Sequence, residues 1–211
     1  RSVVQRLLQL PAVGLEQHIS RAWLTLLLDD KASQRLGLES LTTTERDAQV
    51  NAAVLQLAME QLDSGGFSLW NGREDTPEDD WLTPYAVDFL LDAKAKGIKL
   101  PSGLLERAAR QLVAQLSVAA PSVETRYAFS EIPAHLDFAT RAYALYVLSR
   151  NDKQMVTLSQ LQAMYDKEKG SAQAGLPLVH LGLALNALGD AKRGAEAIAK
   201  GLAVVRDDKL Y

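Results

Sequence analysis

The densest group of side chains that could do chemistry is an acidic run, Glu74-Asp75 followed by Glu78-Asp79-Asp80. Paired carboxylates can hold Mg²⁺ against a phosphate group. The spacing here fits neither DDxxD nor DxDD, the two common patterns for a metal-bound diphosphate. Asp79 and Asp80 are explained more simply as negative charges at the start of the following helix, where they are favourable. The run therefore predicts a helix start and no metal site.

The three histidines, His18, His135 and His180, do not form a metal-site pattern either. No two of them have the i, i+4 spacing of a helical metal site, and none belongs to an HExxH pattern. His180 lies inside the apolar run LPLVHLGLAL and is interpreted as a hydrogen-bonded core histidine, whereas His135 is expected in a loop. GxSxG, P-loop and GxGxxG patterns are absent from the sequence. We assign no catalytic, cofactor-binding or metal-binding residue.

The stretch PAVGLEQ, residues 11–17, is a short turn that raises a question. It stands just ahead of HISRAWLTLLL, whose apolar residues have helical spacing. Gln17 closes the turn, but Gly14, three residues upstream, offers no side chain to pair with it. Composition and periodicity do not indicate what role this glutamine has.

The composition excludes several classes of function. The 211 residues are 47% hydrophobic with a net charge of -3, as in globular proteins, and so small a charge gives no attraction to nucleic acid or an anionic membrane. No cysteine is present, which excludes disulfides, cysteine-based zinc sites and thiol nucleophiles. No apolar run approaches the ~18–20 residues of a membrane span. Because the sequence starts at Arg1 without a Met or a signal peptide, we interpret it as a piece of a longer protein, whose targeting signal could lie elsewhere.

Every strong periodic segment has helical spacing and no strand alternation is convincing, so the predicted fold class is all-α. Roughly eight helices are expected, in the segments 17–28, 41–66, 81–97, 102–116, 136–152, 157–170, 175–190 and 191–205. Thr43 or Thr44 is the expected N-cap of the second segment, with Ser64-Gly65-Gly66 as its stop, and Asp80 is expected to cap the third.

Broad apolar faces such as LGLALNALG must be covered by neighbouring helices. Antiparallel hairpins stacked as an open solenoid or closed into a ring would provide that cover. The last hairpin has tetratricopeptide-like spacing, but no 34-residue period repeats elsewhere. The segment from Gln61 through Gly65-Gly66-Phe67 to Trp70 predicts a tight turn that buries its aromatic residues. Such turns join successive hairpins in ring-shaped α/α folds.

Taken in order, GLEQ, the GGF…W turn and DDWLTPYAVDFLL resemble the thioester domain of bacterial alpha-2-macroglobulins, relatives of complement proteins and broad-range protease inhibitors. In that family a YGCxEQ turn heads a helix, a GGF…W turn follows, and a WLTAYxxxFL helix comes next. The segment AGLPLVHLGLALNALGDAKRGAEAIAKGL also looks like later helices of the family. The resemblance covers essentially the whole chain. It implies one domain over residues 1–211, built as an alpha/alpha toroid-like ring of antiparallel hairpins, whole or truncated.

This chain departs from the resemblance at its opening motif. In thioester-bearing members a cysteine and a glutamine three residues apart condense into an internal thioester, which traps a nucleophile after a protease cuts the bait region. Gly14 stands in the place of that cysteine, so Gly14, Leu15, Glu16 and Gln17 form a vestigial thioester motif without a catalytic role. PAV stands where the family usually has PYG, and a designed removal would more often choose Ala or Ser. We therefore favour a natural thioester-less paralogue over an engineered change.

By the resemblance, the whole protein would be a periplasmic inhibitor that entraps endopeptidases without a covalent bond, and it would need no cofactor. Its partners would be proteases, met through the full-length protein, together with other domains of the same chain and periplasmic partner proteins. Neither nucleic acid nor direct membrane insertion of this segment is expected.

Two alternatives remain open from the sequence. An alpha/alpha-toroid enzyme of the terpene cyclase or prenyltransferase type would need aspartate-rich spacing or zinc ligands, which are missing. Its cavity would also need aromatic walls to hold a carbocation, whereas aromatic residues make up only 6% of the chain. A helical-repeat adaptor is supported by the last hairpin alone.

Overall fold

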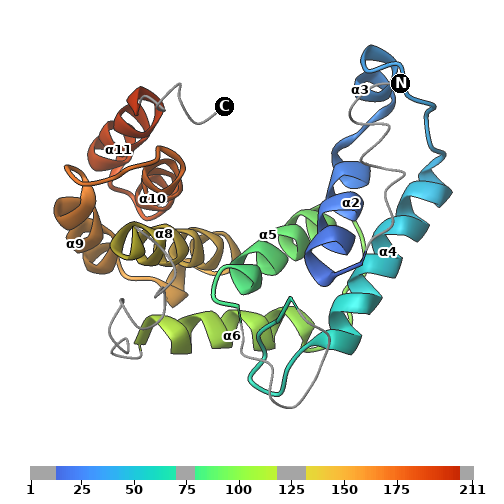
Figure 1. Cartoon of the computed structure of the whole chain (residues 1–211), viewed down its shortest axis with the longest axis horizontal. Helices are drawn as coiled ribbons and strands as arrows, with labels where there is room; N and C mark the ends of the chain where they lie inside the picture. Colours follow the sequence, from blue (N-terminus) through green and yellow to red (C-terminus); the bar gives the residue numbers. More distant parts are fainter. Residues whose placement is uncertain (1–12, 70–78, 118–131, 205–211) are drawn as a thin grey trace. The chain divides into compact units, whose positions relative to one another are not determined.

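The computed structural model of the chain describes residues 13–69, 79–117 and 132–204, which form nine α-helices, one short 3₁₀ helix and no strand (Figure 1). They are α2 (Leu15–Leu27), α3 (Asp30–Arg35), α4 (Thr43–Glu60), α5 (Leu82–Ala95), α6 (Leu104–Ser117), α8 (Pro133–Asn151), η1 (Lys153–Met155), α9 (Leu158–Glu168), α10 (Leu176–Ala187) and α11 (Ala191–Ala203). The all-α prediction is confirmed. Trp70 and the acidic residues Glu74, Asp75 and Glu78 lie outside the described residues.

The sequence did not predict α3, a helix of six residues. Asp29 is its N-cap, and the Asp29 carboxylate accepts a hydrogen bond from the Ala32 N–H at 2.7 Å, which stabilises the first turn. The segment DKASQR carries no apolar periodicity because it is short and largely exposed. Apolar periodicity therefore gives no indication of a helix there.

The start of α4 is set by a capping box one residue ahead of the predicted position. Thr42 is the N-cap, and not Thr43 or Thr44. Thr42 Oγ1 accepts from the Glu45 N–H at 3.2 Å, and Glu45 Oε2 accepts from the Thr42 N–H at 2.9 Å. This reciprocal pair satisfies two backbone donors that the helix itself leaves unpaired.

The prediction that Asp80 caps the next helix is wrong. Helix α5 begins at Leu82, and its N-cap residue is Trp81, which provides no capping side chain. The Asp79 carbonyl instead accepts from the Leu82 N–H at 3.0 Å. This backbone hydrogen bond closes the first turn of the helix.

The described helices gather into two compact units, residues 1–111 and 112–211. In the first unit α2 packs against α4 and α5, and Figure 1 shows α2 (dark blue) beside α4 (cyan). Helix α2 buries Leu15, Ile19 and Leu26, which the helical period places on one face. Helix α5 is buried along most of its length, including Phe89 and Leu90 at 0% exposure, so it forms the centre of this unit's core.

The turn after α4 is tight, as predicted. Gln61 Nε2 donates to the carbonyls of Gly65 (2.9 Å) and Leu104 (3.0 Å). Gly65 has φ +96°, and a Cβ there would lie only 2.5 Å from the Arg107 carbonyl oxygen. Only glycine fits such a position. Phe67 is fully buried, which confirms that the turn buries this aromatic residue.

The second unit is built around α10, which packs against α8, α9 and α11. Helices α10 and α11 approach so closely that their backbones touch. A Cβ at Gly182 would lie 2.7 Å from the Gly194 carbonyl oxygen, and a Cβ at Gly194 would lie 2.9 Å from that of Gly182. Gly175 and Gly201 form a second contact of this kind. The glycine pairs Gly182–Gly194 and Gly175–Gly201 therefore allow the two backbones of the last hairpin to come into contact.

The predicted ring of hairpins concerns how the two units are arranged. That ring, and the single domain over residues 1–211, stay predictions.

Candidate functional site

The stretch Gly14-Leu15-Glu16-Gln17 forms the first turn of α2. Gly14 is the N-cap residue, with φ -134° and ψ 167°, and it has no side chain with which to cap the helix. The Gln17 side chain folds back over the turn, where its Oε1 accepts from the Val13 N–H at 2.8 Å. Leu15 is buried, whereas Glu16 and Gln17 are exposed. The turn thus presents a fixed side-chain amide to solvent.

Glycine is not required by the backbone at position 14. Its φ lies in the extended region that every residue adopts. A Cβ built on Gly14 would have one neighbour within 4 Å, the Leu69 carbonyl oxygen at 3.6 Å, which is an ordinary van der Waals distance. A side chain such as that of cysteine could therefore stand here without moving the backbone.

The turn that contains Leu69 is held by the start of α5. The Leu69 N–H donates to Asp79 Oδ2 at 2.7 Å, and the Phe67 N–H donates to Thr83 Oγ1 at 3.1 Å. Thr83 is fully buried, so this second bond lies in the core. The three motifs on which the resemblance rests, GLEQ, GGF and DDWLTPY, consequently meet at one place in the first unit.

Side chains of α5 also hold the first turns of α2. The Ser20 hydroxyl donates to the Glu16 carbonyl at 2.8 Å and lies 2.8 Å from the Tyr85 hydroxyl. Since Ser20 has used its proton, Tyr85 is the donor in that second bond. Burial raises the pKa of Tyr85, which keeps its hydroxyl protonated. Trp23 Nε1 donates to Asp92 Oδ2 at 2.8 Å further along the same interface.

The sequence patterns do not predict this supporting network. In the sequence, Trp23 belongs to the apolar pattern of HISRAWLTLLL, and Tyr85 belongs to the DDWLTPY motif. The spacing of Tyr85 and Asp92, seven residues apart on one helix, places them on one face. That spacing was the available signal, but it does not identify the helix that α5 packs against.

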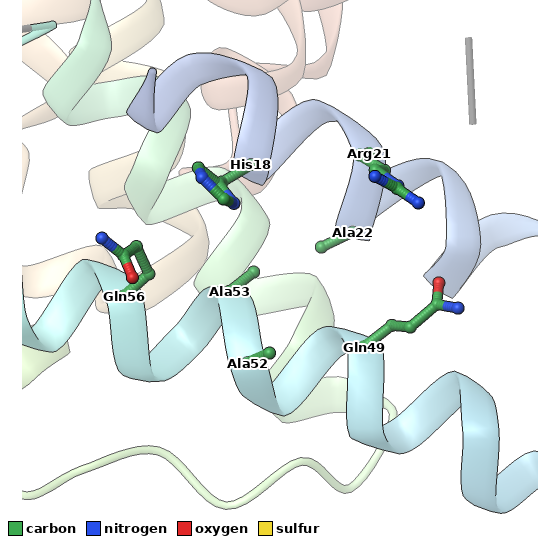
Figure 2. Close-up of a pocket in the computed structure, with 7 residues that line it drawn as sticks. All are labelled: His18, Arg21, Ala22, Gln49, Ala52, Ala53 and Gln56. Carbon is green, nitrogen blue, oxygen red and sulfur yellow. The ribbon is translucent and has the colours of Figure 1, made fainter. Parts of the chain in front are cut away.

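His135 and His180 act as packing groups, whereas His18 is half-buried on α2 and lines a groove between α2 and α4 (Figure 2). His135 lies in the first turn of α8 and not in a loop, and its Nδ1 accepts from the Gln173 N–H at 3.2 Å. The His180 ring stacks on the rings of Tyr143 (4.4 Å between centroids) and Tyr146 (5.0 Å). Burial lowers the pKa of His180 to about 4, so its imidazole is neutral near pH 7. The described residues contain no group of three or more His, Asp or Glu side chains placed to hold a metal ion.

The chemistry available at the start of α2 is therefore limited. An exposed glutamine amide is a poor acyl donor, and the chain has no cysteine thiol to convert it into a better one. Residues around the turn supply hydrogen bonds and packing.

Comparison with known proteins identifies close relatives, although no protein-family model matches the chain. The chain is 38% identical over 202 residues to an alpha-2-macroglobulin of Xylella fastidiosa and 33% identical over 210 residues to the alpha-2-macroglobulin of Escherichia coli. These matches cover 96% and 99% of this chain. The chain spans only 12% of the length of each relative.

Solved structures match over nearly the same extent. The native E. coli alpha-2-macroglobulin, in a crystal structure from domain MG7 to the C-terminus, has a TM-score of 0.81 at 31% identity, covering 99% of this chain and 32% of that chain. The trypsin-activated E. coli protein has a TM-score of 0.78 at 32% identity, covering 93% of this chain and 13% of that chain. Salmonella alpha-2-macroglobulin reacted with methylamine has a TM-score of 0.81 at 33% identity, covering 98% of this chain and 13% of that chain.

Within the described ranges, no helix is both long and apolar enough to cross a membrane. The relatives contradict the terpene cyclase and prenyltransferase alternative, since every match reported above is to an alpha-2-macroglobulin. Over nearly its whole length the chain thus corresponds to a segment of bacterial alpha-2-macroglobulins.

Proposed function

We propose that residues 1–211 are the equivalent of the thioester domain in a bacterial alpha-2-macroglobulin that has lost its thioester. One observation carries the proposal. Gln17 is folded over the turn at which the thioester cysteine would stand, while Gly14 has no side chain although the space for one is present. Gly14, Leu15, Glu16 and Gln17 are then a vestigial motif. Without a thiol, this turn forms no covalent bond to a protease.

The full-length protein, in this proposal, inhibits endopeptidases by entrapping them after they cut its bait region. A trypsin-activated form is known for the E. coli homologue, which supports proteases as the partners. The segment spans 12% of its relatives, so it would act as a structural module that contacts other domains of the same chain. We place the protein in the periplasm and expect it to need no cofactor.

A comparison of large and small substrates tests this function. The full-length protein is incubated with several unrelated endopeptidases, and their activity is measured on a large protein substrate and on a small peptide substrate. We expect activity on the large substrate to be lost selectively, because an entrapped protease still admits small molecules. A protease whose active site is chemically blocked cannot cut the bait region and is the matched control.

Denaturing mass spectrometry of the same mixtures tests the loss of the thioester. We expect no covalent adduct between the inhibitor and the protease. Equal activity on both substrates after bait cleavage would contradict entrapment and point to a scaffold role. An adduct at Gln17 would contradict the interpretation of Gly14.

A further inference from the structure

All the sulfur of this chain is in three methionines, Met59, Met155 and Met164, because no cysteine is present. The three methionines lie within the described residues. A thioether sulfur attacks one oxygen of a peroxide, and the methionine becomes methionine sulfoxide. Since the chain has no thiol that could react in their place, the surroundings of each methionine determine which one a peroxide oxidises first.

Met59 lies near the end of α4, on the side opposite to the buried face of this helix. It follows the buried Val50 by nine residues, which is about two and a half helical turns. The residue is 80% exposed, and Leu55, one turn earlier on the same side, is 57% exposed. A small oxidant can therefore reach the Met59 sulfur directly from solvent.

Met155 and Met164 are better protected, and both are half-buried. Asn151 Nδ2 donates a hydrogen bond to Met155 Sδ at 3.6 Å, which engages a lone pair of the sulfur that would otherwise attack the oxidant. Met164 lines a groove together with the buried side chains of Phe138 and Leu145. An oxidant can approach these two sulfurs from fewer directions.

Oxidation of Met59 changes the surface of α4 and leaves the core unchanged. A sulfoxide is more polar than a thioether, and water solvates it at an exposed position. At Met155 or Met164 the same group would be partly removed from water, which costs stability when the group has no hydrogen-bond donor. The most accessible sulfur is thus also the one whose oxidation the fold tolerates best.

We propose that Met59 is a reversible oxidation site, at which a peroxide converts methionine to its sulfoxide while the chain stays folded. With hydrogen peroxide, one oxygen bonds to the sulfur as the O–O bond breaks, and the other oxygen leaves as water. The sulfur loses two electrons, which the peroxide gains. Methionine sulfoxide reductases reverse the step with a thiol reductant: two thiols become a disulfide and the oxygen leaves as water. This chemistry requires neither bait cleavage nor Gln17, so it is independent of the proposed function.

Limited treatment of the folded 211-residue chain with hydrogen peroxide tests the proposal. Proteolysis and fragmentation of the peptides in a mass spectrometer measure the sulfoxide at each methionine separately. We expect Met59 to react at least about threefold faster than either of the other two, because it is the most exposed. In concentrated urea the three rates should converge, since unfolding exposes all three sulfurs. The chain oxidised at Met59 alone should melt at the same temperature as the untreated chain.

Met59→Leu keeps an apolar side chain without sulfur and should abolish the fastest oxidation. Met164→Leu is the matched control and should leave that oxidation unchanged, with circular dichroism establishing that both variants fold. The two reductases, one for each sulfoxide epimer, should restore the original mass at Met59 in the folded chain. Equal rates in the folded chain, faster oxidation of Met155 or Met164, or a lower melting temperature after oxidation of Met59 alone would overturn the proposal. A sulfoxide at Met59 that the reductases cannot remove would disprove its reversibility.

Discussion

Gln17 has a structural role at the first turn of α2. Its side-chain carbonyl accepts the Val13 N–H at 2.8 Å, which ties the approaching chain to the first turn of α2. Gly14 occupies the N-cap position without a capping group, so the glutamine is the side chain that fastens this end of the helix. That contact gives Gln17 a structural role that does not depend on a thioester.

The first prediction concerns this hydrogen bond. Gln17→Ala should lower the free energy of unfolding by about 0.5–1.5 kcal/mol, towards the lower end because the side chain is exposed. Gln17→Glu keeps the acceptor and adds a negative charge at the helix N-terminus, so its stability should equal or exceed that of the natural chain. Urea denaturation followed by circular dichroism measures both. An alanine variant as stable as the natural chain would refute the fastening role.

A second prediction compares two glycines of the same unit. Gly14→Ser should be neutral or stabilise by a few tenths of a kcal/mol, because serine is a better N-cap and a Cβ has room there. Gly65→Ser should lower stability by more than about 1 kcal/mol, since its φ is +96° and its Cβ would lie 2.5 Å from a carbonyl oxygen. Thermal melting of the two variants ranks them directly. The reverse ranking would mean that the turn at Gly65 can rearrange to accommodate a side chain.

At the scale of elements, the sequence predicted the long helices well and their starts less well. Apolar periodicity locates a helix such as α4, because its buried residues recur on one face. It does not locate α3, whose residues are largely exposed. Nor could it choose between Thr42 and its two threonine neighbours, because a capping bond depends on where the chain turns.

The candidate site was predictable in part for the same reason. The motifs GLEQ, GGF and DDWLTPY can be recognised in the sequence, and they occur in the order in which the family has them. Their meeting point, with Leu69 beside Gly14 and Thr83 under Phe67, depends on tertiary packing. The groove between α2 and α4 gave no signal, since its alanines and glutamines are ordinary helix residues.

The close pairing of α10 and α11 gives a third prediction. Gly182→Ala should destabilise the chain by about 1–3 kcal/mol, because the new methyl group would lie 2.7 Å from the Gly194 carbonyl oxygen. Gly170→Ala is the matched control, since nothing lies within 4 Å of its added Cβ. Urea denaturation compares them. Similar stability of both variants would show that the two helices separate at little cost.

A fourth prediction concerns the contact between α8 and α10. Burial lowers the pKa of His180 from 6.5 to about 4. As the pH falls from about 6.5 towards 4, the unfolded chain binds a proton at this residue that the folded chain does not bind. Stability should therefore decrease across this window. His180→Phe keeps a ring for stacking on Tyr143 but cannot titrate, so its stability should depend less on pH.

The measurement for His180 is the urea midpoint of the natural chain and of His180→Phe at about pH 7 and about pH 5. The drop between the two pH values should be smaller in the variant. An equal drop in both proteins would place the responsible titration elsewhere in the molecule.

At the scale of the whole molecule, the segment must be considered within a protein of which it is a small part. The relatives are about eight times longer, since the chain spans 12% of each. In the proposed function, entrapment of a protease involves parts of the protein outside this segment. The segment itself determines whether the acyl group of Gln17 is activated, as it would be in a thioester. Reaction with a small amine tests this directly.

The last prediction is that methylamine leaves the full-length protein unchanged in mass and in native-gel mobility. A Salmonella homologue has been crystallised after reaction with methylamine, but here the chain offers Gln17 as an ordinary amide, which amines do not attack under mild conditions. Gly14→Cys is the matched variant, because it restores a thiol three residues from Gln17 where a side chain has room. If it forms a thioester, its mass falls by one ammonia, its thiol resists alkylation, and methylamine then adds at Gln17. Uptake of methylamine at Gln17 by the natural protein would show that this amide is activated without sulfur, and the loss of covalent chemistry at this turn would be disproved.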